Sequence, residues 1–424
     1  MIAKVKMRFT MNSPATTLQL VSFLDMICIG LLMPQLGSQA IKLGASQVFI
    51  GTMGALYSGF QLISEPMIGS LSDLKGRKPI LLLSLVLCGS AYLALGLTTS
   101  IIMFFVIRCV LGLMKQTQLL IKALAPDYEK EPDQQAVVFG RLATLSGISF
   151  AIGPVLGGHI MEAFPEAGFT IITVIIWVIY STNAGLIKSL PEIKKSKENK
   201  RNGTIDSVSP KLIESLTDSV KQSIDQFYKV DWTVYWDVFI FKLTISFCMG
   251  MYFSNYAIFL KTKHEAPPMY LGYIVSLQGV IGAIGSYFIG HINKLYADDV
   301  DYSQRVCHIF LALTVSLLGM AVAPSIYVYV LFVIPFALSS AVSRIVGLEI
   351  IMSKGDSERR GSVIGAMGTL RSLSGVVTPL LAGFIGQYLG ITYTLLIAAF
   401  ITSIGVVNSY KFKSQNVSVR PKED

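Results

Sequence analysis

Eleven residues, from Gly69 to Pro79, place four charged side chains and two glycines between two long apolar runs. The first run covers residues 49–71 and the second covers residues 79–97. Each has about the twenty residues that an α-helix needs to cross the hydrocarbon core of a bilayer. Charged side chains are costly inside hydrocarbon, so the sequence predicts that this segment is a tight turn at one face of a membrane.

The composition favours a polytopic membrane protein over a soluble globular one. Apolar residues make up 52% of the 424 residues and charged residues only 14%, whereas soluble domains carry about a quarter charged residues. The mean hydropathy is +0.59. We expect the net charge of +9 to set the orientation of the chain in the bilayer rather than to bind nucleic acid.

The sequence shows no pattern that would hold a metal, a cofactor or a catalytic group. The five cysteines lie in or beside apolar runs and form no C-x-x-C pair, which argues against a disulfide framework and a zinc site. The four histidines have no ligand spacing, and no phosphate-binding loop or nucleophile motif occurs. We therefore expect neither an enzyme nor a bound cofactor or metal.

Twelve apolar runs are long enough to span a bilayer, which predicts an all-α membrane protein with twelve transmembrane helices. We expect an amino-terminal six-helix bundle over 1–190, a polar cytoplasmic linker with one short amphipathic helix over 191–235, a carboxyl-terminal six-helix bundle over 236–411 and a cytoplasmic tail over 412–424. The predicted spans are residues 16–36, 49–71, 79–98, 100–123, 138–161, 168–190, 237–260, 269–293, 306–323, 325–352, 361–386 and 390–411.

Basic residues favour one orientation of these spans. If both termini lie in the cytoplasm, the loops on that side hold 27 of the 35 lysines and arginines. The loops on the other side then hold Lys42, Lys261 and Lys263. Because positive charge accumulates on the cytoplasmic side of membrane proteins, we expect cytoplasmic termini. The sequence carries no signal that identifies which membrane the protein occupies.

The two halves of the chain share a repeat. Residues 138–158 align without gaps on residues 363–383, and GPVLGG in the first segment corresponds to TPLLAG in the second. A weaker match places Gly51 opposite Gly272. Duplicated bundles with a ligand site near the membrane midplane are the plan of secondary transporters. We therefore expect two pseudo-symmetric six-helix bundles around a central cavity.

Ionisable residues inside the predicted spans mark the candidate site, because each costs roughly 2.5–3.5 kcal/mol at the middle of a membrane helix. Asp25 of the first span lies at a depth between those of Arg108 and Lys115 of the fourth span. Arg108 and Lys115 are seven residues apart and would share one face of a continuous helix. We expect one of them to pair with Asp25.

Three roles for Asp25 stay open. The carboxylate and its cation could form a structural ion pair that joins two spans, or Asp25 could contact the substrate directly. We prefer a third role, in which Asp25 gains and loses a proton during the transport cycle. A desolvated carboxyl binds a proton more tightly once a neighbouring cation moves away, which would couple proton flow to movement of a solute.

The charged turn carries the pattern G-x-x-x-D-x-x-G-R-K and resembles the loop signature of the major facilitator superfamily. The first span, with LDMICIGLLMP at 24–34, resembles the first helix of tetracycline-type drug:proton antiporters in that superfamily. Arg108 with Gly112 is similar to their fourth-helix motif, whose arginine is implicated in proton coupling. The segments 236–239 and 252–256 look most like an animal branch of orphan carriers. This resemblance implies a small-molecule substrate and protons as the coupling ion.

The fifth span resembles the motif associated with antiporters in the same family. Its glycines have the spacing that allows a neighbouring helix to approach closely, and its proline permits a bend. We expect these residues to pack against other helices or to change their packing during gating. They are Gly147, Gly153, Pro154, Gly157 and Gly158.

The resemblance also implies a gating role for the charged turn. In the superfamily the loop aspartate caps a helix of the other bundle, so Asp73 is expected beside the helix start near Gly361. The basic residues could instead only anchor the turn at the cytoplasmic face. The gating candidates are Gly69, Asp73, Gly76, Arg77 and Lys78.

Other polar residues in the predicted spans are candidates for the cavity wall. Hydrogen bonds between helices, or side chains that reach up to the membrane surface, would explain them equally well. Arg371 has no counterpart in the repeat and no assigned role. The candidates are Glu65, Gln116, Lys242, Asn255, Gln278, Arg344 and Glu349.

We expect a monomeric carrier in the lipid bilayer that works by alternating access and exchanges a small organic solute for protons. A facilitator or a symporter on the same scaffold, and a carrier-like receptor that does not transport, stay open. The substrate charge also stays open, because the candidate charges have mixed signs. These are Asp25, Lys115, Lys242 and Arg344.

Overall fold

The computed structural model describes residues 13–129, 131–192, 232–299, 301–354 and 360–419. Every regular element in these ranges is a helix. The predicted amphipathic helix of the linker lies outside the described residues. The amino-terminal half contains α1 (Pro14–Lys42), α2 (Gln47–Lys75), α3 (Arg77–Leu97), α4 (Ile101–Met114), α5 (Thr117–Tyr128), α6 (Pro132–Ala163) and α7 (Gly168–Ser189). The carboxyl-terminal half contains α9 (Trp232–His264), α10 (Pro268–Tyr287), α11 (Ile289–Lys294), α12 (Ser303–Val322), α13 (Ile326–Lys354), α14 (Arg360–Tyr388) and α15 (Ile391–Val419).

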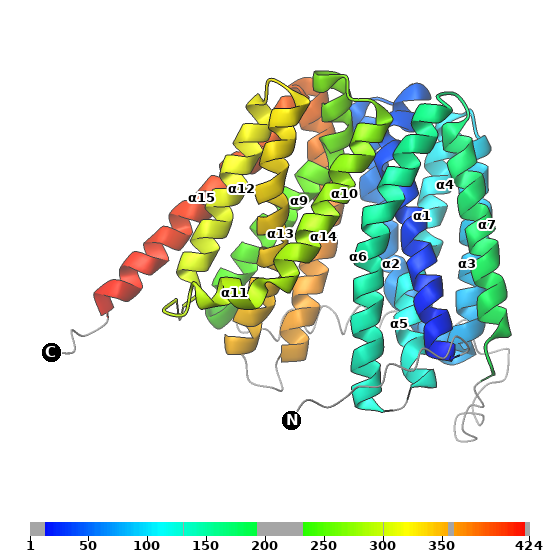
Figure 1. The fold of residues 1–424 in the computed structure, drawn as a ribbon, viewed down its shortest axis with the longest axis horizontal. Coiled ribbons are helices and arrows are strands. Elements are labelled where there is room, and N and C mark those ends of the chain that lie inside the picture. The colour runs from blue at the N-terminus through cyan, green and yellow to red at the C-terminus, as the bar shows by residue number, and fades with distance from the viewer. Residues whose placement is uncertain (1–12, 130, 193–231, 300, 355–359, 420–424) are drawn as a thin grey trace.

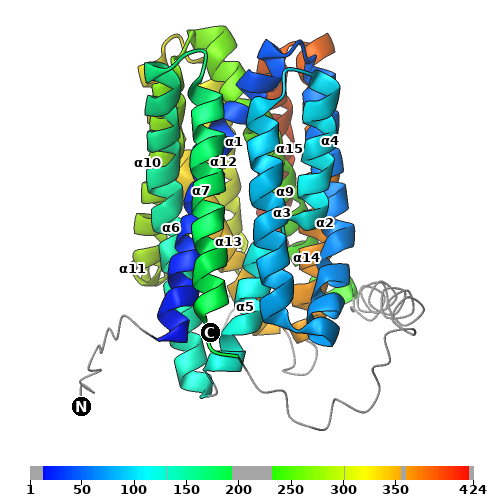
Figure 2. The ribbon, with the colours of Figure 1, turned by 90° about the vertical axis from the view of Figure 1, so that its right-hand side faces the viewer.

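These helices form two bundles that stand side by side (Figure 1). Figure 2 shows the amino-terminal bundle in front, with α3 and α7 nearest the viewer. Each bundle has its own hydrophobic core, which includes Phe104 and Tyr180 in the first bundle and Tyr252, Tyr329 and Phe336 in the second. The predicted fold of two six-helix membrane bundles is confirmed.

Eleven helical segments in the described ranges are long and apolar enough to cross a bilayer, with α4 and α5 counted as one segment. The twelfth long helix is α2, which has 29 residues. We call the membrane side on which α1 begins and α15 ends the amino-terminal face (Figure 1), and the side on which α1 ends at Lys42 the opposite face. Which of the two lies in the cytoplasm stays a prediction.

The prediction of one continuous helix over residues 100–123 is wrong. α4 ends at Met114 and α5 begins at Thr117, and Lys115 between them has a non-helical backbone with φ −81° and ψ 66°. The Ser84 hydroxyl donates a hydrogen bond of 2.7 Å to the Met114 carbonyl oxygen. A helix can break inside a membrane only where other protein groups satisfy the freed backbone in this way.

The predicted helix over residues 269–293 is interrupted as well, although less severely. Its first part is α10 and its last part is the short α11, and Phe288 separates the two. The interruption lies near the amino-terminal face (Figure 1). Because it lies beside the loop that leads to α12, it does not alter the middle of the span.

The charged turn fastens α2 and α3 to α5 at the amino-terminal face. Arg77 forms ion pairs with Asp73 at 3.0 Å and with Asp127 at 2.9 Å. Lys78 donates hydrogen bonds to two carbonyl oxygens at the end of α7. Between the two helices Gly76 has φ +101° and ψ 141°, a conformation that residues with a Cβ adopt only under strain.

The substitution Gly76→Ala tests this backbone requirement. We expect a loss of about 1–3 kcal/mol in the free energy of unfolding, because alanine is strained at this positive φ. The measurement is thermal unfolding of the purified protein in detergent. Gly69→Ala is the matched control, since a Cβ at Gly69 would meet no atom within 4 Å. Equal losses for the two variants would contradict the assignment.

Candidate functional site

The amino-terminal bundle contains a carboxylate, Asp25 of α1, that no solvent reaches, with an exposed fraction of 0%. Its Oδ1 accepts hydrogen bonds from Lys115 Nζ at 2.6 Å and from the Tyr180 hydroxyl at 2.6 Å. Its Oδ2 accepts hydrogen bonds from the Thr117 hydroxyl at 2.9 Å and from Gln118 Nε2 at 2.8 Å. Both oxygens are therefore fully satisfied, which compensates for the removal of the charge from water.

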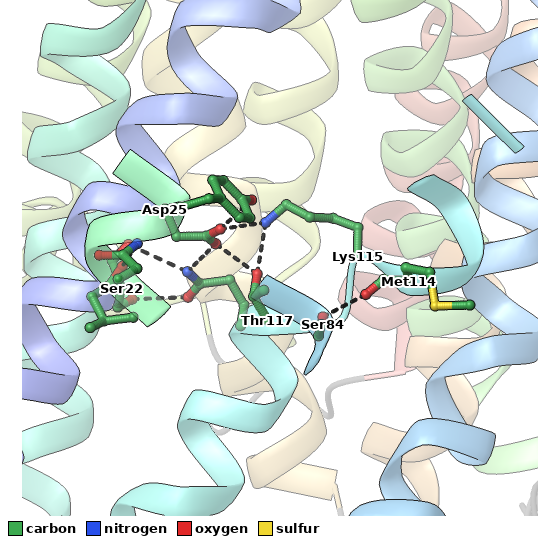
Figure 3. Close-up of polar contacts among 10 residues, drawn as sticks. Ser22, Asp25, Ser84, Met114, Lys115 and Thr117 are labelled. Carbon is green, nitrogen blue, oxygen red and sulfur yellow. Dashed lines mark hydrogen bonds and ion pairs between the residues drawn. The ribbon is translucent and has the colours of Figure 1, made fainter. Parts of the chain in front are cut away.

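The break between α4 and α5 delivers the cation to this carboxylate. Lys115 extends from the non-helical link toward Asp25, with Thr117 below it (Figure 3). The ammonium also donates a hydrogen bond of 2.7 Å to the Thr117 hydroxyl and lies 5.5 Å from the centre of the Tyr180 ring. The ion pair therefore joins α1, the α4–α5 link and α7 into one buried polar cluster.

The structure separates the two cations that the sequence placed on one helix face. Lys115 pairs with Asp25, but Arg108 lies against α2, with its Cζ 4.2 Å from the centre of the Tyr57 ring. The prediction that they share a face is wrong, because the helix ends before Lys115. Among the described residues the buried Nε of Arg108 has no hydrogen-bond partner. A role for Arg108 in proton coupling stays a prediction.

Three of the predicted cavity residues make hydrogen bonds between helices. Gln116 Nε2 donates to the Ser64 hydroxyl at 2.9 Å, and Asn255 Nδ2 donates to the Ala382 carbonyl oxygen at 2.8 Å. Gln278 Nε2 donates to the hydroxyl of a buried tyrosine of α9 at 2.6 Å. These contacts agree with the structural alternative, and a role in substrate binding stays a prediction.

Arg344 and Glu349, two further candidates on α13, have different neighbours. Glu349 accepts a hydrogen bond of 2.8 Å from Asn293 and forms an ion pair of 3.4 Å with Arg305. Arg344 lies beside Lys242 of α9, whose Nζ is 3.5 Å from the Arg344 carbonyl oxygen. Lys242 and Arg344 therefore lie together without an ion pair among the described residues, whereas Arg305 of the same bundle is paired with carboxylates.

Two matched contacts join the bundles near the opposite face. A Cβ on Gly51 of α2 would lie 2.3 Å from the carbonyl oxygen of Pro379 on α14. A Cβ on Gly272 of α10 would lie 2.2 Å from the carbonyl oxygen of Pro154 on α6. These two glycine–proline pairs occupy aligned positions of the sequence repeat, so the repeat appears in space as a pseudo-symmetric pair of contacts. Only glycine allows the backbones to approach so closely.

The remaining small residues of α6 divide between two neighbours. A Cβ on Gly153 would lie 2.8 Å from the Ile27 carbonyl oxygen of α1. A Cβ on Gly157 would lie 2.4 Å from the Leu31 carbonyl oxygen, one turn further along α1. Gly158 faces the other bundle, where a Cβ would lie 2.8 Å from the Pro268 carbonyl oxygen. The predicted close packing of this motif is therefore present on both sides of the helix.

Two predicted gating glycines have no packing role in this conformation. A Cβ added to Gly69 or to Gly147 would meet no atom within 4 Å. The expected contact of Asp73 with the helix start near Gly361 adjoins residues 355–359, which lie outside the described ranges. The gating assignments for these residues therefore stay predictions.

Three hydrogen-bond donors to the Asp25 carboxylate were not predicted from the sequence. Thr117 and Gln118 belong to the polar run KQTQ at 115–118, which interrupts an apolar span and could have indicated the helix break. Tyr180 lies in an apolar run without a comparable signal, and only its 2.6 Å contact with Asp25 identifies it.

Comparisons with known proteins place these features in a family context. A family model described as Major Facilitator Superfamily matches residues 16–379. Tetracycline resistance protein, class H, of Pasteurella multocida is 24% identical over 394 residues, which cover 89% of this chain and 90% of the relative. Quinolone resistance protein NorA of Staphylococcus aureus is 23% identical over 389 residues, which cover 88% of this chain and 90% of the relative.

A solved structure shares the fold. The crystal structure of a bacterial homologue of the human lysosomal transporter Spinster, in an inward-facing and unoccupied conformation, matches with a TM-score of 0.73. The match covers 97% of this chain and 98% of that chain at 11% sequence identity. At this identity the likeness establishes the fold and carries no information about substrate.

Breaking the buried ion pair tests how the carboxylate is held. Lys115→Met should lower the free energy of unfolding by about 3–5 kcal/mol, because it leaves a buried charge without its partner. The double variant Asp25→Asn/Lys115→Met should recover most of this loss, since it removes both charges. Thermal unfolding in detergent measures both variants.

The control for this test is Lys122→Met, because Lys122 is an exposed lysine of α5. It should unfold close to the wild-type temperature. The ion pair would be unimportant for stability if Lys115→Met unfolded like this control, or if the double variant were no more stable than the single one.

Proposed function

We propose a transport function from the premise that this chain belongs to the major facilitator superfamily. The protein is a multi-pass membrane transporter, and its relatives include tetracycline and quinolone resistance proteins. Its proposed activity is the exchange of a small organic solute for protons by alternating access. The observation that carries this proposal is the buried pair of Asp25 and Lys115 at a break in a membrane helix.

Lys115 is the mobile partner in the proposed cycle. Its backbone lies in the non-helical link, so a small change in the angle between α4 and α5 would withdraw its ammonium from Asp25. Without the cation the buried carboxylate would be left uncompensated and would take up a proton instead. Return of the ammonium would expel that proton, and the two arrangements would face different sides of the membrane.

The matched glycine–proline contacts support the conformational part of the proposal. They bring backbone atoms of the two bundles together near the opposite face, where Ile50 of α2 packs against both cores. Separation there would release this contact and leave the fully buried core residues of each bundle in place. Rocking of two such bundles about a central site is the general mode of transport for duplicated carriers. In this cycle the charged turn with Asp73 would form the gate at the amino-terminal face, with both termini in the cytoplasm.

Two narrower points belong to the same proposal. The relatives' names suggest tetracycline-like and quinolone-like drugs as first transport probes. The aromatic segments 236–239 and 252–256 suggest kinship with the animal orphan carriers called major facilitator superfamily domain-containing protein 9. A facilitator on the same scaffold would move solute without moving protons, and a carrier-like receptor would move neither.

Asp25→Asn separates proton coupling from solute movement. In proteoliposomes with an imposed pH gradient we expect this variant to lose uphill transport and to keep exchange between two solute pools, because asparagine cannot carry the proton. The probes are tetracycline, a quinolone and small carboxylates, with a pH-sensitive dye inside the vesicles. Thr117→Val is the matched control, since it removes the hydrogen bonds of this hydroxyl with Asp25 and Lys115 and leaves both charges unchanged.

Uphill transport by Asp25→Asn at the wild-type rate would reject Asp25 as the proton site. Solute movement without any proton movement in the wild-type protein would indicate a facilitator. Absence of both fluxes for all probes would favour a receptor.

A further inference from the structure

The two bundles differ in how their intramembrane charges are arranged. In the amino-terminal bundle Asp25 and Lys115 neutralise each other, and Arg108 lies separately against Tyr57. In the carboxyl-terminal bundle Lys242 of α9 lies beside Arg344 of α13, and Arg371 of α14 is near enough to repel both. We call these three residues the basic cluster.

Contacts between the helices bring the basic cluster together. Lys242 Nζ lies 3.5 Å from the carbonyl oxygen of Arg344. Its side chain crosses Gly347 of α13, where a Cβ would lie 2.2 Å from Lys242 Cε, so this glycine makes room for the lysine. The positive charge of Arg371 acts on both Lys242 and Arg344.

The basic cluster faces the other bundle rather than the lipid. Gly375, one turn after Arg371 on α14, has its Cβ position 3.6 Å from Ser58 of α2. Residues four apart share a helix face, so Arg371 points toward the amino-terminal bundle. Arg344 Nη2 lies 3.8 Å from the Cβ position of Gly282 on α10, one turn after a contact of α10 with α6 at Gly279.

The cluster lacks an anion within the described part of the chain. No ion pair joins Lys242, Arg344 or Arg371 to a carboxylate there, and Glu349 of α13 is held by Arg305. The side chains of Arg344 and Arg371 are exposed and that of Lys242 is half-buried. Basic side chains inside a membrane protein that are accessible but unpaired mark a binding pathway for a negatively charged group.

We propose that the basic cluster binds the carboxylate or phosphate group of an organic anion, which is the transported solute of the proposed carrier. Arginine presents a planar fork of donors that matches both groups with two parallel hydrogen bonds. An anion between Arg344 and Arg371 relieves their mutual repulsion, and Lys242 adds a third donor from α9. That the anion is transported rests on the proposed transport function. That an anion binds rests on the basic cluster alone.

A phospholipid headgroup offers the same phosphate chemistry, since basic pockets between membrane helices also bind anionic lipids. The cluster faces the neighbouring bundle, which favours a solute that enters between the bundles. The test therefore includes a lipid arm.

Thermal unfolding of the purified, full-length protein in detergent measures binding without any gradient. The probes are citrate and adenosine monophosphate, with choline as the cationic comparison, all at constant ionic strength. We expect both anions to raise the unfolding temperature in a saturable way and choline to have no effect. Lys242→Gln, Arg344→Gln and Arg371→Gln should each weaken anion binding at least about tenfold, the effect of losing one charge-assisted hydrogen bond.

Two variants keep this test independent of folding. Lys242→Arg retains the charge and should retain binding. Lys261→Gln removes a basic residue from the other end of α9 and should leave binding unchanged. Equal anion responses in the wild type and in all three glutamine variants, or no saturable response to either anion, would overturn the proposal.

In the lipid arm, phosphatidylglycerol is added to the detergent micelles. This lipid could shift the unfolding temperature in a way that depends on the basic cluster. If neither citrate nor adenosine monophosphate reversed that shift, the assignment of the cluster to a solute would be overturned. An anion response together with absent flux in proteoliposomes would refute transport and leave the anion site standing. Proton-coupled flux of a cationic solute, together with no anion response, would refute the anion site and leave the proposed transport function standing.

Discussion

A buried ion pair between Asp25 and Lys115 is the interaction on which the amino-terminal bundle depends. A charge without contact with solvent needs a partner and a full set of hydrogen bonds, and Asp25 has both. The partner comes from a chain segment that has left the helical conformation, and a hydroxyl from α3 satisfies the backbone at that break. The cluster is therefore fully paired as observed, and the rearrangement that we propose for it needs a change in only one short link.

The two bundles differ in the charged residues that they contain. The amino-terminal bundle buries a neutral ion pair, for which we propose exchange of the cation for a proton, and the carboxyl-terminal bundle presents a basic cluster without a matching carboxylate among the described residues. Backbone contacts at Gly51 and Gly272 link the bundles, and side-chain contacts such as that of His159 with Tyr273 accompany them. Contacts of this kind can be made and broken as units, which suits rigid-body rocking of separately packed bundles.

Much of this architecture could be predicted from the sequence. Apolar runs of membrane length predicted the long helices. The repeat aligned Gly51 with Gly272, and the structure places these two glycines in equivalent contacts. The break at Lys115 was missed because span length and hydropathy do not report backbone conformation. The role of Tyr180 was missed for another reason, since its contact with Asp25 joins residues 155 positions apart in the chain.

Difference infrared spectroscopy tests the central claim most directly, because it reports whether Asp25 carries a proton. The comparison is between the wild type and Gly51→Leu/Gly272→Leu, whose leucines would clash with the facing carbonyl oxygens and drive the opposite-face contacts apart. At the same mildly acidic pH, we predict a protonated-carboxyl band in the double variant that is absent from the wild type and disappears when Asp25→Asn is added. A band that survives Asp25→Asn, or an ionised carboxylate in both conformations, would contradict the account.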